Sequence, residues 1–494
     1  MRALLMRLTL ASLLLFAVAC NQDLKPRPPV ETRLYYPSGV AVVAATDGGL
    51  GWLYVANSNF DRRFDVGWLT AIDLSQVHTS EPDGGRSLPL PGQAIAPPPD
   101  GGSDQGRPVQ FTQLATTTAN LVNIASFAGL ATADGAGTRL FVPSRSEGDE
   151  LAVMDITNPG DGGVPLRCFF SGGNDCTVDS LRLATEQDPG NFGIPAAPQP
   201  YTVTLSPNFP DGGVDDRIYV THLRPASQPA QSVNNLQNFL VTLHQADLDN
   251  ARASWATNGS YVVPDSAFSS IGRGASNSIA VTPAFLYVSG RAKLASTDPD
   301  VLLRVVDRES NLVAFPQLQL VWASLDARGL QLRPPDENRL YLAVDNPAAL
   351  LVMDITVPAG ENPVPSFTLV RAVPLPAGPN DVELLTRPGR APLVVISCSV
   401  DGSLAFYDDD LGQITALIPG VGAVPFGIAI DRRGDDWARL YVSNFGDGRV
   451  AVVDVPLSAT VAGGRLAPRL VAHVGPKQYC LLATDDRTCV DTTP

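Results

Sequence analysis

The stretch Arg439–Val455, RLYVSNFGDGRVAVVDV, contains the unit from which most of the chain is built. It reads as two short strands, LYVSN and VAVVDV, joined by a Gly-Asp-Gly turn at residues 446–448. Apolar and polar residues alternate in the first strand, and β-branched residues crowd the second, which is typical of strands. A hairpin this short cannot bury both of its faces alone, so neighbouring copies must cover it.

Copies of this hairpin occur along the whole chain. The first strand recurs as LYVAN (Leu53–Asn57), LFVPS (Leu140–Ser144), IYVTH (Ile218–His222), LYVSG (Leu286–Gly290) and LYLAV (Leu340–Val344). A sixth copy, Val395–Asp408, aligns with Tyr441–Asp454 without a gap and places Cys398 at the position of Asn444. A short apolar strand precedes each copy, and the seven read PSGVAV (37–42), FAGLAT (127–132), PYTVTL (200–205), SNSIAV (276–281), ARGLQL (327–332), PNDVEL (379–384) and PFGIAI (425–430).

The repeat predicts an all-β fold, a seven-bladed β-propeller of four-stranded antiparallel blades spanning 36–475. Outer strands are expected after the closing Asp of each copy, for example at Thr368–Val373 and Leu470–Val474. Repeated four-stranded units of about 40–45 residues are typical of propellers. A β-sandwich is the alternative for many short strands, but it does not explain a three-part motif in fixed order. The motifs resemble the YVTN β-propeller repeat family, with PSGVAV, LYVAN and VAVVDV matching its blade pattern.

The N-terminus has the features of a secretory signal. Arg2 and Arg7 precede the apolar run Leu8–Val18, and the sequence AVAC ends at Cys20. This run is too short for a membrane span. It resembles a bacterial lipoprotein signal, which implies removal of residues 1–19, lipidation of Cys20 and anchoring at the outer membrane, on its periplasmic face or at the cell surface. A plain secretory signal is the alternative. Residues 20–35 are Pro-rich and are expected to act as a tether.

The surplus length is expected in loop insertions at 75–121, 158–199 and 222–238, with a C-terminal extension at 476–494. The composition of 75–121, which contains PPPDGG, predicts loop. An exported protein can hold disulfides, so we expect local bonds, and a metal site is the alternative. The expected pairs are Cys168 with Cys176 and Cys480 with Cys489. Cys398 lies inside a repeat strand and is expected to be buried and inert.

Charge and motifs exclude several functional classes. The net charge is −15, so the basic patch that nucleic-acid binding requires is absent. No G-x-S-x-G, H-E-x-x-H or C-x-x-C-H motif occurs, and no catalytic residue, metal or cofactor is predicted. The closing aspartates recur at one repeat position, where we expect them to cap turns. They are Asp73, Asp155, Asp354, Asp408 and Asp454.

A candidate site follows from the predicted propeller geometry. The first side chains of the inner strands should gather at one mouth of the central channel, where a small polar or anionic ligand or a peptide end could bind. The position after the P of P-x-G provides Ser38, Ala128, Tyr201, Asn277, Arg328, Asn380 and Phe426, and the next position adds Asp381. The alternative interpretation is that the mouth is polar only because it is exposed to water and binds no ligand. Phe60–Val66, FDRRFDV, is a second polar stretch, expected to be a solvated turn or a partner contact.

These patterns predict a monomeric, lipid-anchored envelope protein that acts as a scaffold for a protein or glycan partner. The fold by itself does not give a function. A hydrolase is the alternative from another class, because some propellers that resemble this repeat hydrolyse lactones. Asn277, Asn380 and Asp381 would then hold a divalent cation at the channel mouth.

Overall fold

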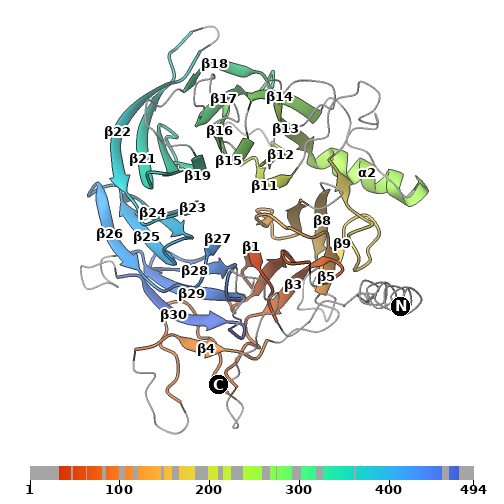
Figure 1. The fold of residues 1–494 in the computed structure, drawn as a ribbon, viewed down its shortest axis with the longest axis vertical. Helices are drawn as coiled ribbons and strands as arrows, with labels where there is room; N and C mark the ends of the chain where they lie inside the picture. Colours follow the sequence, from red (N-terminus) through yellow and green to blue (C-terminus); the bar gives the residue numbers. More distant parts are fainter. Residues whose placement is uncertain are drawn as a thin grey trace, which may run out of the picture.

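Seven antiparallel sheets form a ring around a central axis in the computed structural model (Figure 1). The structure describes residues 33–477 except 46–47, 63, 81–84, 99–105, 115–120, 146–149, 158–165, 184–198, 208, 210–214, 224–236, 259–266, 274, 292–301, 319–325, 361–362 and 459–466. The predicted fold class is therefore confirmed. Among the described residues, no helix has the length and apolar character needed to cross a membrane.

Each blade is formed by consecutive strands, and the first of them lies nearest the central axis and the last at the periphery. The inner strands are β1 (Pro37–Val43), β6 (Thr132–Ala133), β11 (Pro200–Leu205), β15 (Ala275–Val281), β19 (Asp326–Leu332), β23 (Pro379–Arg387) and β27 (Pro425–Arg433). The second strands are β2 (Trp52–Asn57), β7 (Arg139–Ser144), β12 (Arg217–His222), β16 (Phe285–Arg291), β20 (Arg339–Asp345), β24 (Arg390–Cys398) and β28 (Trp437–Asn444). These second strands carry the LYV motifs.

The third and outer strands complete the sheets. The third strands are β3 (Gly67–Asp73), β8 (Glu150–Ile156), β13 (Gln237–His244), β17 (Leu303–Asp307), β21 (Ala349–Thr356), β25 (Ser403–Asp408) and β29 (Arg449–Pro456). The outer strands are β5 (Leu121–Ile124), β9 (Leu166–Cys168) with β10 (Leu181–Arg182), β14 (Phe268–Arg273), β18 (Val313–Leu318), β22 (Ser366–Pro374), β26 (Gln413–Ile418) and β30 (Arg469–Val474). The predicted outer strands at 368–373 and 470–474 lie within β22 and β30. A helix, α2 (Gln245–Asn258), follows β13.

The faces of adjacent blades bury one another, as we expected because a single hairpin cannot bury both of its faces. One core cluster joins Leu393, Val395 and Phe406 of blade six to Leu440 and Val453 of blade seven. The ring of the LYV tyrosine is almost fully buried in every blade that has it, at Tyr54, Tyr219, Tyr287, Tyr341 and Tyr441. Burial of an aromatic side chain removes a large apolar area from water, so these positions hold the blades together.

The P-x-G motif forms a β-bulge at the start of the inner strand. In six blades the register with the second strand shifts there, as between Pro425, paired with Asn444, and Ile428, paired with Val442. A bulge leaves one residue outside the ladder, so the N–H of the G position needs another partner. A hydroxyl on the second strand provides this partner in four blades.

These hydroxyl groups bridge neighbouring blades. Ser443 of β28 accepts the N–H of Gly427 in its own blade at 2.9 Å and donates to the carbonyl of Ser38 in blade one at 3.0 Å. Thr221, Ser289 and Ser397 make the same pair of bonds. Each accepting carbonyl belongs to the residue after P in the next blade, so this bridge also positions the mouth residues.

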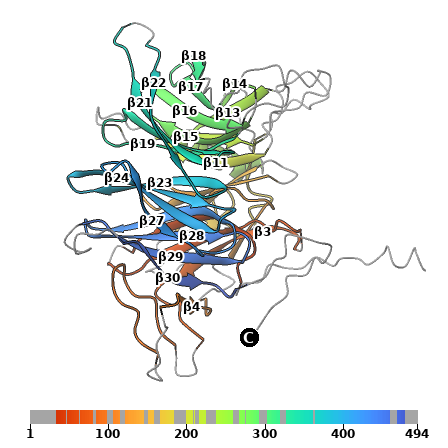
Figure 2. The ribbon, with the colours of Figure 1, turned by 60° about the vertical axis from the view of Figure 1, so that its left-hand side comes forward.

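The ring is closed by a segment that comes from blade one. Strand β4 (Val109–Phe111) pairs in parallel with β30, the outer strand of blade seven (Figure 2). Val77, Leu88 and Phe111 of the same insertion are buried against Val450 and Val474. The insertion 75–121, which we expected to be loop without a core, thus differs from that expectation at these residues. Its few apolar side chains are buried because blade seven offers an open edge, which the composition of the insertion does not reveal.

The closing aspartates do more than cap turns. Asp454 pairs with Arg439, the residue before LYV, at 2.7 Å with both side chains fully buried. Asp354 pairs with Arg339 in the same cross-strand register. Asp408 pairs with Arg387 and also caps a turn, because its Oδ1 accepts the N–H of Asp410 at 3.0 Å. Asp73 accepts the N–H of Ser75 and caps a turn as expected. The turn interpretation omitted the arginine that faces the aspartate across the strands.

The predicted cysteine chemistry is confirmed where the structure describes it. Cys168 and Cys176 form a disulfide with an S–S distance of 2.04 Å. Cys398 is a buried free thiol, and burial raises its pKa to about 12, so it is not a nucleophile near neutral pH. Cys20, Cys480 and Cys489 lie outside the described residues.

Candidate functional site

The structure brings some of the predicted mouth residues together. The rings of Tyr201 and Phe426, from blades three and seven, lie with their centroids 6.1 Å apart. Asn380 donates from Nδ2 to the carbonyl of Phe426 at 3.4 Å. The guanidinium of Arg145 lies 5.6 Å from the Tyr201 ring centroid. Arg328 pairs with Asp326 at 2.7 Å. Burial raises the pKa of the Tyr201 hydroxyl, and Arg328 and Arg145 oppose that shift, so both cations act on this ring.

Other predicted mouth residues belong to the wall. Ser38 is buried and its hydroxyl donates to the carbonyl of Ala56. Asn277 is also buried, and its amide donates to the carbonyl of Ala327 at 2.5 Å. Ala128 is completely buried. A residue at the same repeat position can therefore face the mouth in one blade and tie two blades together in another.

An aromatic cluster adjoins this mouth. Phe60, in the turn of the blade-one hairpin, contacts Tyr36, Phe127 and Phe445 with ring centroids 5.4 to 6.0 Å apart. Phe445 in turn contacts Phe426 at 6.1 Å. We call Tyr36, Phe60, Phe127, Phe426 and Phe445 the aromatic rim. The cluster joins turns of blades one, two and seven at the end of the ring where the inner strands begin.

Two observations describe how this rim meets solvent. The side chain of Phe60 is 45% exposed, although it is a large apolar residue. Arg62 lies over the Phe127 ring at 5.2 Å from the centroid, a cation–π contact. Phe60 and Arg62 of the stretch 60–66 thus present an aromatic ring beside a cation. The other arginine of this stretch, Arg63, lies outside the described residues.

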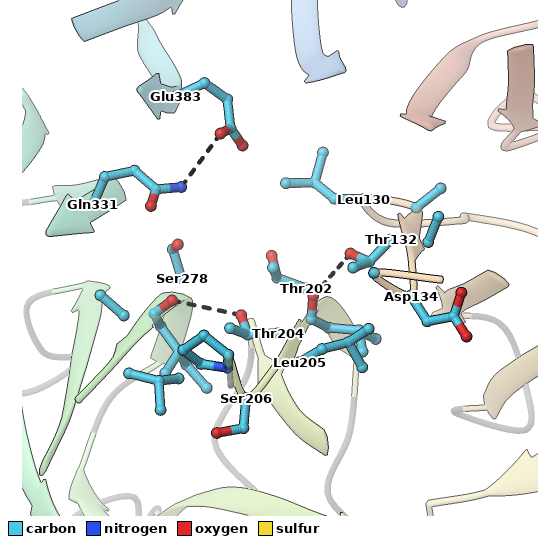
Figure 3. Close-up of a pocket in the computed structure, with 18 of the residues that line it drawn as sticks. Leu130, Thr132, Asp134, Thr202, Thr204, Leu205, Ser206, Ser278, Gln331 and Glu383 are labelled. Carbon is cyan, nitrogen blue, oxygen red and sulfur yellow. Dashed lines mark hydrogen bonds between the residues drawn. The ribbon is translucent and has the colours of Figure 1, made fainter. Parts of the chain in front are cut away.

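A cavity of about 850 Å³ occupies the channel below the mouth. Its lining comes from the bodies of the inner strands and from the turns at their far ends, such as Asp134 and Asp216. Of the predicted site residues, Asp381 is the one that lines it. Figure 3 shows Glu383, Gln331, Thr202 and Ser278 arranged around one common space. The cavity therefore opens away from the aromatic rim.

The lining of the cavity contains two carboxyl groups from one strand. Asp381 and Glu383 lie two residues apart on β23, and side chains at this spacing point to the same face. Asp381 accepts the N–H of Ile428 from blade seven at 2.9 Å. Glu383 accepts Nε2 of Gln331 at 3.5 Å (Figure 3). Burial raises the pKa of Asp381 to about 6, and burial, followed by the charge of Asp381, raises that of Glu383 well above its usual value.

The hydroxyl groups of the cavity lining donate their protons to backbone carbonyls of neighbouring inner strands. Thr202 donates to the carbonyl of Asn277 at 2.8 Å, and Thr132 donates to the carbonyl of Val203 at 2.8 Å. A hydroxyl has one proton and two lone pairs, so these side chains offer acceptors to the cavity. Gln331 likewise directs its amide protons at Glu383 and leaves its oxygen for other partners.

Sequence reasoning did not identify Glu383 or Gln331 as site residues. The signal was present, because the inner strands carry small or apolar residues at these positions in blades one, two and seven, whereas PNDVEL and ARGLQL carry Asp, Glu and Gln. The alternation D-V-E puts both carboxyls on one face of a strand. The predicted mouth used only the first residues of the inner strands, so it omitted both side chains.

The three residues of the cation alternative also make hydrogen bonds to the backbone of the channel wall. The amide nitrogens of Asn277 and Asn380 are directed to backbone carbonyls, and the Asp381 carboxylate accepts a backbone N–H. Within the described ranges, no group of three or more His, Cys, Asp and Glu side chains is placed to hold a metal ion. Asn277 and Asn380 thus connect neighbouring blades, whereas Asp381 also lines the cavity.

The architecture and the channel define a seven-bladed β-propeller, and several solved structures are similar to it. They include hydrazine synthase from Kuenenia stuttgartiensis, at 12% identity and a TM-score of 0.46 over 90% of this chain and 98% of that one. A putative 6-phosphogluconolactonase from Bacteroides uniformis matches at 12% and 0.43, over 78% and 85%. The propeller domain of Cps50 (Swd1) from Myceliophteria thermophila matches at 10% and 0.46, over 85% and 96%. No protein-family model and no curated protein matches the sequence.

Proposed function

We propose that this protein is an exported, lipid-anchored β-propeller of the YVTN type that binds a partner protein of the cell envelope through the aromatic rim. The observation that supports it most directly is the 45% exposed ring of Phe60, which is held by three other aromatic rings. Aromatic and Arg side chains dominate the binding energy of protein interfaces. The rim supplies both, with Arg62 and Arg145 beside the rings.

The proposed anchor would hold this rim near the membrane. The chain enters blade one at Tyr36, a member of the rim, so the tether leaves from that end of the ring. The thirteen residues 21–33 between Cys20 and Leu34 are Pro-rich. In an extended polyproline conformation they span about 40 Å at ~3.1 Å per residue. A monomer anchored at the outer membrane would thus present the rim to neighbouring envelope proteins.

The test compares the soluble domain, residues 21–494, with two variants in pull-downs from envelope extract. Phe60→Ser removes the exposed ring of the rim. Val400→Ser is the matched control, because Val400 is 77% exposed in the corresponding turn of blade six but is outside the aromatic rim. We expect a protein captured by the native domain and by Val400→Ser and lost with Phe60→Ser. Equal capture by all three, or capture of a glycan alone, would contradict a protein-binding rim.

Anchoring and catalysis are tested separately. Replacement of Cys20 by Ala should release the protein from the membrane fraction, and the mass of the native mature N-terminus should show acylation. The hydrolase alternative requires activity on a lactone that is lost with Asp381→Asn, whose carboxyl has a pKa near 6 suited to proton transfer. Metal-free protein without lactonase activity would remove that alternative.

A further inference from the structure

The channel cavity is independent of the aromatic rim and has a different chemical character. Its described lining contains six acidic side chains and no Lys, Arg or His. They are Asp134, Asp215, Asp216, Glu337, Asp381 and Glu383. A low-dielectric cleft lined by charges of one sign concentrates the field inside it. The cavity therefore attracts cations.

The acidic groups at the outer edge have partners, whereas the central pair has no cation beside it among the described contacts. Asp215 pairs with Arg308, and Asp216 contacts His244 at 2.7 Å. The described donors to this pair are neutral N–H groups, from Val382 and Ile428 to Asp381 and from Gln331 to Glu383. Burial raises the pKa of both carboxyls, because a negative charge is unfavourable there without a cation beside it.

The rest of the lining determines what kind of cation fits. Thr132 and Thr202 face the cavity with acceptor lone pairs, because their protons are used by the wall. Leu130, Ile279 and Ile428 add apolar surface to the same lining, and Ile428 lies beside Asp381. A ligand with N–H donors at one end and alkyl carbon beside them satisfies both surfaces. A bare metal ion would need further carboxyl or imidazole ligands, which the described residues do not bring together.

We propose that the channel cavity binds a small organic amine, with its ammonium group between Asp381 and Glu383 and its alkyl chain against Leu130 and Ile428. The volume of about 850 Å³ lies within the range of small-molecule sites. The amine would enter from the end that carries Asp134 and Asp216, since Arg145 and Arg328 lie at the opposite mouth. The site does not depend on the lipid anchor or on the aromatic rim.

The experiment measures binding of putrescine and spermidine to the mature protein by calorimetry, with 1,4-butanediol as the neutral analogue and calcium chloride as the metal probe. Glu383→Gln keeps the shape of the side chain and removes its charge, and Asp381→Asn is the second variant. Asp401→Asn is the control, because Asp401 is an exposed acid in a blade-six turn outside the cavity.

We expect at least one amine to bind, the diol not to bind, and each cavity variant to weaken binding by about tenfold or more, because one partner of a buried charge pair is lost. Asp401→Asn should change the affinity by less than about twofold, since an exposed charge is screened. The proposal is overturned if neither amine binds, if the diol binds equally, or if both cavity variants keep native affinity. Calcium that binds where neither amine does would also overturn it.

Discussion

The seven inner junctions between blades are of two kinds, and the difference follows from one residue of the repeat. After blades three, four, six and seven, a hydroxyl at the fourth residue of the LYV strand bridges to the next inner strand. Blades one, two and five have Ala56, Pro143 and Ala343 at this position, and no such bridge. They carry a glycine at the G position instead, at Gly39, Gly129 and Gly329.

At the glycine junctions the backbones themselves approach. A Cβ on Gly129 would lie 2.1 Å from the carbonyl oxygen of Tyr201, and one on Gly39 would lie 2.4 Å from the N–H nitrogen of Ala131. The N–H of Leu130 bonds directly to the Tyr201 carbonyl at 3.0 Å. Adjacent inner strands are thus joined in one of two ways. Either a hydroxyl group bridges them, or a glycine lets their backbones come into direct contact. Blade seven has both Gly427 and Ser443.

The largest effect is expected at a glycine junction. Gly129→Ala places a methyl group into the Tyr201 carbonyl and should lower the free energy of unfolding by about 3 kcal/mol, since backbone must shift. Urea denaturation followed by tryptophan fluorescence measures it. Gly135→Ala is the control, because no atom lies within 4 Å of its added Cβ. A Gly129 variant as stable as the Gly135 variant would show that the close approach is not needed.

A hydroxyl junction should respond less. Ser443→Ala leaves the N–H of Gly427 and the carbonyl of Ser38 without this partner and should cost about 1–3 kcal/mol. Ser366→Ala, at an exposed hydroxyl, should change stability by less than about 0.5 kcal/mol. The same urea titration compares the two variants. If both behave alike, the bridge contributes nothing and the comparison between junctions fails.

The smallest effect concerns the junction that closes the ring, where acid should act through His473. This residue of β30 contacts Gln110 of β4 at 3.2 Å and the carbonyl of Val421 at 2.7 Å. Burial lowers the pKa of His473 to about 4 in the folded protein. Between about pH 6.5 and pH 4 the unfolded chain therefore binds a proton at His473 that the folded protein does not bind. The resulting stability is present above pH 6.5 and is lost as the pH falls towards 4.

Between pH 7 and pH 5 this contribution amounts to about 1–2 kcal/mol. Melting temperatures of the native protein and of His473→Gln, measured across this range, should converge as the pH falls. A constant difference between the two proteins would mean that His473 does not sense acid. His473→Gln removes the titrating group and leaves the Ser443 hydroxyl in place. It therefore separates the pH effect from the Ser443 bridge, which also joins blades seven and one.

The repeat alone predicted the ring, because alternation and turn residues are local properties that every blade displays. PFGIAI followed by LYVSN and VAVVDV is enough to assign three strands and their order. The mouth was predicted less well. Tyr201, Asn380 and Phe426 meet, whereas Ser38 and Asn277 are turned into the wall, and the repeat position is the same in all of them.

The amino-acid sequence by itself thus determined the number of blades, the strand order, the Cys168–Cys176 bond and the burial of Cys398. Only the tertiary structure placed β4 against β30 and Glu383 beside Gln331. The first group depends on contacts within one blade or one loop, where residue spacing fixes geometry. The second depends on pairs separated by many residues, whose proximity exists only once the seven sheets have closed into a ring.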